Sequence, residues 1–269
     1  TVDQLEDRDR FYQLLEKLDI PHVPGAIANN EDELLQLAEE LGFPVLVRPS
    51  YVIGGSGMNI YENREELKVG IEGNSYPLLI DKYVPGKEAE VDLVADGKDI
   101  CIPVIAEHIE KAGIHSGDSM AYLPSQTLSE GIINKIVIYA EKMVQHLQYK
   151  GLMNIQYVIS GEDVYVLEVN PRASRTIPII SKVANVPLVQ IATKLLLGKY
   201  SLSDLVEKTG LLEPFNYYVV KYPVFSTFAL NGLDSKLGPE MKSTGEGIAI
   251  ADSKEEALDE LQNSIVKEL

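Results

Sequence analysis

Oxygen-bearing side chains gather at the end of one short apolar stretch, DVYVLEVNPRAS at residues 163–174. Alternation along a strand places Glu168 and Asn170 on the same face, and the chain then turns into Arg172 and Arg175. Carboxylate and amide oxygens suit a hard cation such as Mg²⁺ or Mn²⁺, whereas arginines neutralise phosphoryl oxygens. The stretch therefore predicts a metal site beside an anion clamp.

A neighbouring strand adds a third oxygen ligand to this cluster. Gln156 lies in GLMNIQYVIS, and a tight turn separates that segment from the strand of Glu168. We expect a hairpin in which Gln156 and Glu168 are cross-strand neighbours. Gln156, Glu168 and Asn170 would then hold the metal. A simpler alternative is that Glu168 and Arg172 only pair with each other at the strand end.

A glycine-rich loop, YVIGGSGM at residues 51–58, offers backbone N–H groups to phosphate oxygens. It contains Gly54, Gly55, Ser56 and Gly57. Glycine pairs also make ordinary hairpin turns, and the loop matches neither the P-loop nor the Rossmann pattern. Arg48 closes the preceding strand, VLVRPS, where it either reaches the same phosphates or lies on the surface.

Two further segments could contact a nucleotide. The strand ending at Val84 could offer backbone groups to an adenine edge, and Glu90 could accept hydrogen bonds from ribose hydroxyls. An ordinary connector between lobes explains the same residues. The loop AGIHSGDS places His115 and Ser116 between glycines, although a purely structural role for the histidine is an alternative.

The elements that position these residues are short strands in hairpins, with helices between them. A hairpin is expected around Asp96–Gly97 and another around Gly161. We expect helices on one side of the strands, which favours an antiparallel α+β fold over a doubly wound parallel sheet. Four parts are expected: a leading helix (1–20), a small lid lobe (21–84), a large lobe with the metal site (85–230) and a C-terminal extension (231–269).

Composition narrows the possible functions. The 269 residues are 45% hydrophobic, and no run approaches the roughly 20 apolar residues that span a bilayer. The N-terminus lacks signal-peptide features, so we expect a cytoplasmic protein without membrane partners. A net charge of −17 argues against nucleic acid but not against a nucleotide held by local arginines. Cys101 lies in an apolar run and is expected to be an inert buried thiol.

Five ordered segments resemble the large chain of the carbamoyl-phosphate synthase family. They are VRPSYVIGGSGM, AEHIEKAGIHSGDS, GLMNIQYVIS, VLEVNPRASRTIPIISKVANVP and LGPEMKSTGE. Four shorter stretches resemble the second, carbamoyl-phosphate-forming half of that chain: SYVIGG, EHIEKAGIHSGDS, RTIPIISK and LGPEMKSTGE. The resemblance implies an ATP-grasp fold, with the nucleotide between two lobes. It also implies ATP-dependent phosphorylation of carbamate for arginine and pyrimidine synthesis.

The resemblance also implies a set of site residues and ligands. The metal ligands for two Mg²⁺ or Mn²⁺ ions would be Gln156, Glu168 and Asn170, with Arg172 and Arg175 near the transferred phosphoryl group and the acyl substrate. The ATP or ADP contacts would be Arg48, Gly54, Gly55, Ser56, Gly57, Lys82, Val84, Glu90, Gly113, Ile114, His115, Ser116, Gln156 and Glu168. K⁺ is a further candidate ion. Two departures from the family pattern affect Lys82, beside a segment of its own length, and Gly57, in a loop that differs between the halves.

The family's chain has parts that these 269 residues do not match. Expected partners are carbamate, ATP, the remaining domains of the large chain, including the regulatory domain beyond the C-terminal extension, and a glutamine-hydrolysing small subunit. Two alternatives follow. The chain could act alone as a nucleotide-binding module with little turnover, or it could be another ATP-grasp ligase, similar to biotin carboxylase. LGPEMKSTGE favours the synthase over the latter.

Overall fold

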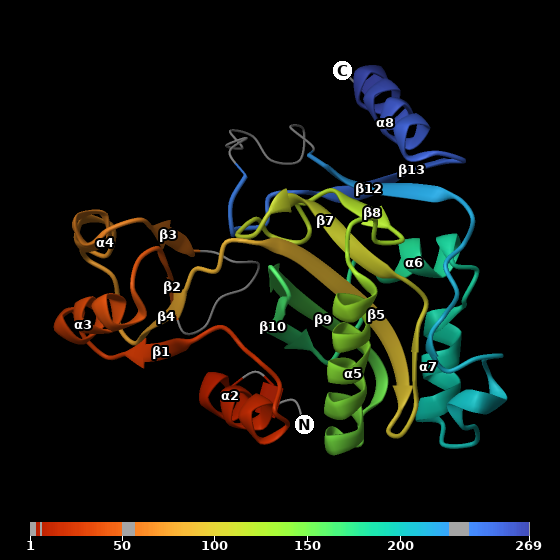
Figure 1. Ribbon diagram of the computed structural model, residues 1–269, viewed down its shortest axis with the longest axis horizontal. Coiled ribbons are helices and arrows are strands. Elements are labelled where there is room, and N and C mark those ends of the chain that lie inside the picture. Colours follow the sequence, from red (N-terminus) through yellow and green to blue (C-terminus); the bar gives the residue numbers. More distant parts are fainter. Residues whose placement is uncertain (1–3, 6, 50–56, 226–236, 269) are drawn as a thin grey trace.

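Two lobes make up the protein, as Figure 1 shows for this computed structural model. The structure describes residues 4–5, 7–49, 57–225 and 237–268, with side chains up to residue 262. Gly54, Gly55 and Ser56, predicted to contact phosphate, lie outside the described residues. The small lobe, with α3 and α4, lies to the left of the large lobe in this view.

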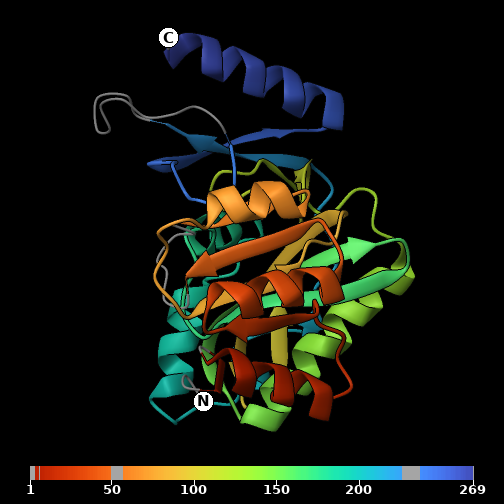
Figure 2. The same cartoon turned by 90° about the vertical axis from the view of Figure 1, so that its left-hand side faces the viewer.

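The small lobe is a four-stranded antiparallel sheet with two helices (Figure 2, where this lobe faces the viewer). Its strands run in the order β1-β4-β2-β3, with bounds β1 Gly25–Ala28, β2 Val45–Pro49, β3 Asn59–Tyr61 and β4 Leu78–Lys82. The helices are α3 Glu31–Leu41 and α4 Arg64–Gly70, capped by the side chains of Asn30 and Asn63. The sequence analysis missed β1, because its four residues include a glycine and follow two prolines.

The large lobe contains a nine-stranded sheet, in which the central path is β10-β9-β5-β7-β8-β12-β13. The strands are β5 Lys87–Asp96, β6 Ile100–Ile102, β7 Ile105–Lys111, β8 Ala121–Leu123, β9 Lys150–Ser160, β10 Asp163–Asn170, β11 Gly210–Leu211, β12 Tyr218–Val224 and β13 Gly245–Ala251. Apart from the parallel pair β11 and β6, these strands pair antiparallel. The predicted α+β class is therefore confirmed.

Helices cover both faces of the large sheet, so the expectation of helices on one side is wrong. They are α2 Arg8–Lys17, α5 Glu130–Leu147, α6 Ile177–Val183, α7 Leu188–Leu196 and α8 Lys254–Glu268, with a 3-10 turn η1 Leu202–Asp204. Helices α2 and α5 pack on one apolar cluster, whereas α6 and α7 pack on another that contains Val94 and Ala106. The central strands carry apolar side chains on both faces, and each face needs a cover.

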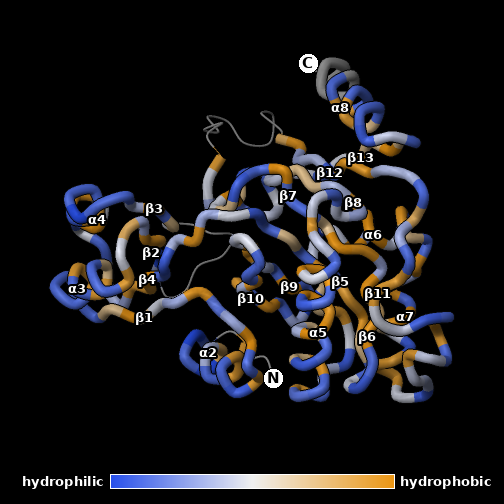
Figure 3. Tube along the Cα trace, viewed as in Figure 1, coloured by the Kyte–Doolittle hydropathy of each residue, from blue (hydrophilic) through white to orange (hydrophobic). Residues whose placement is uncertain are grey.

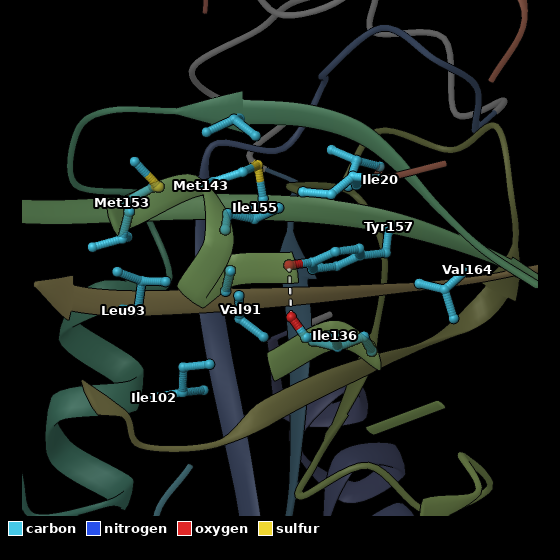
Figure 4. Packing of buried hydrophobic residues seen from close by; sticks show 14 of the residues in the cluster. Ile20, Val91, Leu93, Ile102, Ile136, Met143, Met153, Ile155, Tyr157 and Val164 are labelled. Carbon is cyan, nitrogen blue, oxygen red and sulfur yellow. Dashed lines mark hydrogen bonds between the residues drawn. The ribbon is translucent and has the colours of Figure 1, made fainter. Parts of the chain in front are cut away.

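The main core lies between α5, α2 and one face of β5, β9 and β10 (Figure 4). Leu93, Met153 and Ile155 meet Ile136 of α5 there, and all four are fully buried. Tyr157 is the only labelled side chain with a hydroxyl group, which donates to the backbone oxygen of Ile136 at 3.3 Å. Figure 3 shows the corresponding apolar segments in the interior of the large lobe.

No single helix among the described residues is long and apolar enough to cross a membrane. The pair α6 and α7 passes that test by length and composition only, with a bend of 111° at its break.

Candidate active site

The hairpin of β9 and β10 brings three of the predicted ligands together. Glu168 lies directly opposite Gln156, and Asn170 lies opposite Asn154, which confirms the predicted cross-strand pairing. An irregularity between Val166 and Glu168 shifts the register there. A bulge of this kind re-aims the side chains that follow it. Glu168 is exposed at this end of the strand, so its carboxylate is open to a ligand.

Hydrogen bonds join this cluster to the turn that follows. Asn170 Nδ2 donates to Glu168 Oε1 at 2.6 Å, and Arg172 Nη2 donates to Asn170 Oδ1 at 3.2 Å. Within the described residues Glu168 and Arg172 form no ion pair, contrary to the simpler alternative. The site thus offers one carboxylate and two amide groups.

This donor set fits a hard divalent cation. Mg²⁺ takes few protein oxygens and completes its shell with water and phosphate oxygens, so one exposed carboxylate beside amide oxygens is sufficient. In the described part of the chain no group of three His, Cys, Asp or Glu side chains could hold a metal by itself. The roles of Gln156, Glu168 and Asn170 as ligands stay a prediction.

The predicted nucleotide loop, residues 113–116, lies against the same hairpin. Gln156 Nε2 donates to Ser116 Oγ at 3.3 Å, and the Gly113 N–H donates to Glu88 Oε1 at 2.9 Å. Gly113 has a φ of 98°, and an added Cβ would lie 2.9 Å from Cδ1 of Ile60 in the small lobe. Glycine is required there by backbone conformation and by close approach of the lobes.

His115 is held as a neutral imidazole in this loop. Burial lowers its pKa, an effect that nearby Arg175 reinforces and that Asp118 and Glu168 oppose. The Gly117 N–H donates to His115 Nδ1 at 3.0 Å, so this nitrogen acts as an acceptor. Any proton on the neutral ring is then on Nε2. Ile114, the remaining predicted residue of the loop, is partly buried beside it.

A group of charges joins the two lobes at Arg48. Its Nε lies 3.7 Å from Asp81 Oδ2, and Arg8 Nη2 lies 2.7 Å from Asp81 Oδ1. Burial and the neighbouring Arg8 lower the pKa of Arg48, while Asp81 and Glu168 oppose this shift. Tyr12 of α2 also donates to Asp81, at 2.8 Å. The sequence analysis missed Arg8, because charges in EDRDR are typical of a solvated helix. It also missed Asp81, a single acidic residue near the end of the apolar strand β4.

The predicted adenine contacts lie where the small lobe meets the large one. Val84 packs in a small apolar cluster with Val23 and Val158. The side chain of Lys82, the last residue of β4, packs against its own lobe. Its Nζ donates to the backbone oxygens of Gly42 at 2.6 Å and Phe43 at 3.1 Å. Its predicted nucleotide contact therefore competes with two existing hydrogen bonds.

Glu90 lies deeper than the sequence analysis implied. It is 2% exposed, and its carboxylate lies 3.9 Å from Nε2 of His108. Burial by itself would raise the pKa of Glu90, but His108, Lys221 and Asn154 lower it to about 2. His108 also lies 3.4 Å from Glu88, and both carboxylates raise its pKa to about 9 against the opposing effect of burial.

The sequence analysis named Glu90 but missed the buried polar row to which it belongs. Glu88, Glu90 and Asp92 alternate with apolar residues along β5, and this alternation was the available signal. Lys221 of β12 is fully buried, and its Nζ donates to the Ser116 backbone oxygen at 2.9 Å and lies 3.7 Å from Glu246. No sequence pattern links Lys221 to a loop 105 residues earlier.

Asp92, also in this row, is fully buried, and its raised pKa favours the neutral carboxyl. Burial raises its pKa to about 8, and Glu90 and Glu246 add to this effect. Ser174 and Asn154 oppose the shift, but neither carboxyl oxygen has a well-formed hydrogen bond with a described residue.

Comparison with known proteins places this site in a family. Residues 7–204 match the family model described as "Carbamoyl-phosphate synthase L chain, ATP binding domain". Two relatives named carbamoyl phosphate synthase arginine-specific large chain are similar. The one from Geobacillus stearothermophilus is 63% identical over 259 residues and the one from Bacillus subtilis (strain 168) is 48% identical over 268 residues, which covers 95% and 98% of this chain. The chain spans about a quarter of the length of these relatives, 25% and 26%.

Solved structures agree with this at the level of the fold. A biotin carboxylase–β,γ-ATP complex from Campylobacter jejuni superposes with a TM-score of 0.73 at 15% identity, covering 96% of this chain and 65% of that one. The ADP complex of the N5-carboxyaminoimidazole ribonucleotide synthetase PurK gives 0.69 at 16% identity, covering 97% and 71%. The fold is therefore ATP-grasp, as expected. Because the family model matches most of this chain, the chain belongs to the carbamoyl-phosphate synthase large-chain family and contains the ATP-binding domain of that family.

Proposed function

We propose that this chain phosphorylates carbamate with ATP, giving carbamoyl phosphate and ADP, and that it corresponds to the second half of the synthase large chain. The single observation that carries the proposal is the cluster at the end of β10, where Gln156 faces Glu168 and also bonds to the 113–116 loop. The segments EHIEKAGIHSGDS, RTIPIISK and LGPEMKSTGE support the assignment to the second half.

The proposed chemistry needs little covalent participation by the protein. Glu168, Gln156 and Asn170 would hold one or two Mg²⁺ or Mn²⁺ ions, which neutralise charge on the phosphoryl oxygens when bound. Arg172 and Arg175 would orient the anionic reactants and stabilise charge that develops during transfer. Arg48, in the small lobe, is close enough to Glu168 for that carboxylate to affect its pKa. Closure of the two lobes would exclude water, in which carbamate and its phosphate decompose.

The nucleotide is proposed to lie between the lobes. The loop 113–116 would line its phosphate and ribose end, with Val84 and its apolar neighbours beside the base. We assign the ribose contact to Glu88 rather than Glu90, because Glu88 is the more exposed of the two and already bonds to Gly113. Glu90 instead fixes His108 and Asn154 inside the sheet. A glutamine-hydrolysing small subunit as a partner, a role for K⁺ and a cytoplasmic location belong to the same proposal.

The test is the partial reverse reaction, in which ATP forms from carbamoyl phosphate and Mg·ADP. Glu168→Gln should reduce ATP formation by about three orders of magnitude or more, since the carboxylate charge is lost at the reacting phosphoryl group. Glu162→Gln, in the exposed turn of the same hairpin, is the matched control and should leave the rate unchanged. Full activity of Glu168→Gln would refute the metal assignment.

The same experiment separates the alternatives. ATP hydrolysis that depends on bicarbonate, with no ATP formed from carbamoyl phosphate, would assign the chain to the first half of the synthase. Mg²⁺-dependent ADP binding without any turnover would favour the nucleotide-binding module, whose missing domains would supply the rest of the acyl pocket. The nucleotide-binding module is the second candidate because the chain spans only about a quarter of the length of its relatives.

A further inference from the structure

A segment beyond the family-model match folds back over the proposed site. The match ends at residue 204, whereas residues 237–244 lie between the undescribed part of the chain and β13. The backbone N–H of His115 donates to the backbone oxygen of Gly238 at 2.8 Å, so this segment lies along the 113–118 loop. Its residues are thus available to position groups of the site.

Ser243 occupies the centre of this contact and is 7% exposed. Its Oγ accepts a hydrogen bond from Arg175 Nη1 at 3.1 Å and donates to the Gly117 backbone oxygen at 2.8 Å. The Ser243 N–H donates to Asp118 Oδ1 at 2.8 Å. One small side chain therefore links an arginine of the site to the loop assigned to the nucleotide.

Two neighbours hold Ser243 in place. Asp118 is fully buried, and its second oxygen, Oδ2, accepts the Lys242 N–H at 2.7 Å. At Gly117 an added Cβ would lie 3.1 Å from Met241 Sδ and 3.2 Å from Arg175 Nη1. The absence of a side chain at residue 117 thus lets Arg175 and Met241 approach the loop this closely.

The contacts among the described residues fix one end of the Arg175 guanidinium. Its hydrogen bonds to Met241 Sδ, at 3.0 Å, and to Ser243 all use Nη1. Nη2 and Nε have no partner among the residues that the structure describes. These two nitrogens form one edge of the planar fork, which is the geometry that binds a carboxylate-like group through two parallel hydrogen bonds.

We propose that Ser243 is a positioning residue, which holds Nη1 of Arg175 so that the Nη2–Nε edge faces the carbamoyl group of the substrate. The proposal rests on the proposed function and names a residue outside the matched ATP-binding domain. Gly117 and Asp118, which lie just beyond the nucleotide loop 113–116, hold Ser243 in this position.

The test compares Ser243→Ala with wild type in the full polypeptide that carries these residues. In the reverse reaction the KM for carbamoyl phosphate should rise roughly tenfold or more, since a hydrogen bond to a charged group is lost. The Kd for Mg·ADP should stay within about twofold, because no contact proposed for the nucleotide is removed. Ser243→Thr retains the hydroxyl and should restore most of the lost affinity.

Further variants keep the test independent of misfolding. Ser181→Ala removes a buried hydroxyl that has no hydrogen-bond partner among the described residues, and it should change neither constant. In an Arg175→Gln background, Ser243→Ala should have no additional effect, since the two residues would act as one unit. Gly117→Ala should raise the KM for carbamoyl phosphate as Ser243→Ala does.

The outcomes separate this inference from the proposed function. An active wild type with an unchanged KM in Ser243→Ala, or additive effects in the Arg175→Gln background, would overturn the role of Ser243 alone. A wild type that forms no ATP but binds carbamoyl phosphate would refute turnover, and the Kd of that ligand would then test Ser243. A wild type that neither turns over nor binds carbamoyl phosphate would refute both.

Discussion

Strand β5 buries both of its faces, yet the two faces carry opposite chemistry. On one face Val91 and Leu93 are fully buried in the main core. On the other, Glu90 and Asp92 are 2% and 0% exposed. The apolar face gains free energy by leaving water, whereas each charge on the polar face costs desolvation that partners must offset. The two faces are equally buried, but one forms part of the main core and the other holds charged groups beside the candidate site.

The largest effect on stability is expected from Lys221→Met on the polar face. It removes the buried ammonium beside Glu246 and the Ser116 backbone oxygen, so the unfolding free energy should fall by about 3–5 kcal/mol. Urea unfolding measures this loss, and exposed Lys199→Met is the matched control. A loss below about 1 kcal/mol would show that the charge contributes little to the folded state.

On the apolar face, Leu93→Ala should cost about 3 kcal/mol through lost burial and the cavity that remains. Leu196→Ala, at a residue 66% exposed, should cost far less. The Kd for Mg·ADP of folded Leu93→Ala should match wild type, because this face does not meet the proposed nucleotide. A large change in that Kd would blur the distinction between the two faces.

A pH series should separate the faces by titration of His108. Its pKa is raised from 6.5 to about 9, so its contribution to stability is complete below pH 6.5 and is lost as pH rises toward 9. His108→Gln should flatten this decline, which is on the order of 2–3 kcal/mol, even though its overall stability is lower. Urea midpoints between pH 6.5 and 9 measure the slope. Exposed His146→Gln should retain the wild-type decline.

The smallest effect is expected from Asp92→Asn. Its carboxyl has a pKa near 8, so at pH 6 it is neutral and an amide replaces it at a cost of less than about 1 kcal/mol. Glu90→Gln, two residues away on the same face, removes an ionised partner of His108 and should cost several times more. Equal losses in the two variants at pH 6 would contradict the assigned protonation states.

Local patterns predicted the hairpin that carries the candidate site. The spacing between Gln156 and Glu168 indicated their pairing across the hairpin. The strands β1, β8 and β13 were missed. Two of them are only three or four residues long, and β13 follows a segment without a strong alternation. Their pairing depends on partners that lie far away in the sequence.

The sequence by itself determined the class of fold, the oxygen-rich end of β10 and the family to which the chain belongs. Only the tertiary structure brought Lys221 to Ser116, Ser243 to Arg175 and Arg8 to Asp81. Periodicity and turn chemistry act over a few residues, so they specify hairpins and helices. Buried charges find their partners across the folded chain, because an ion that leaves water needs an opposite charge or a dipole wherever the fold provides one.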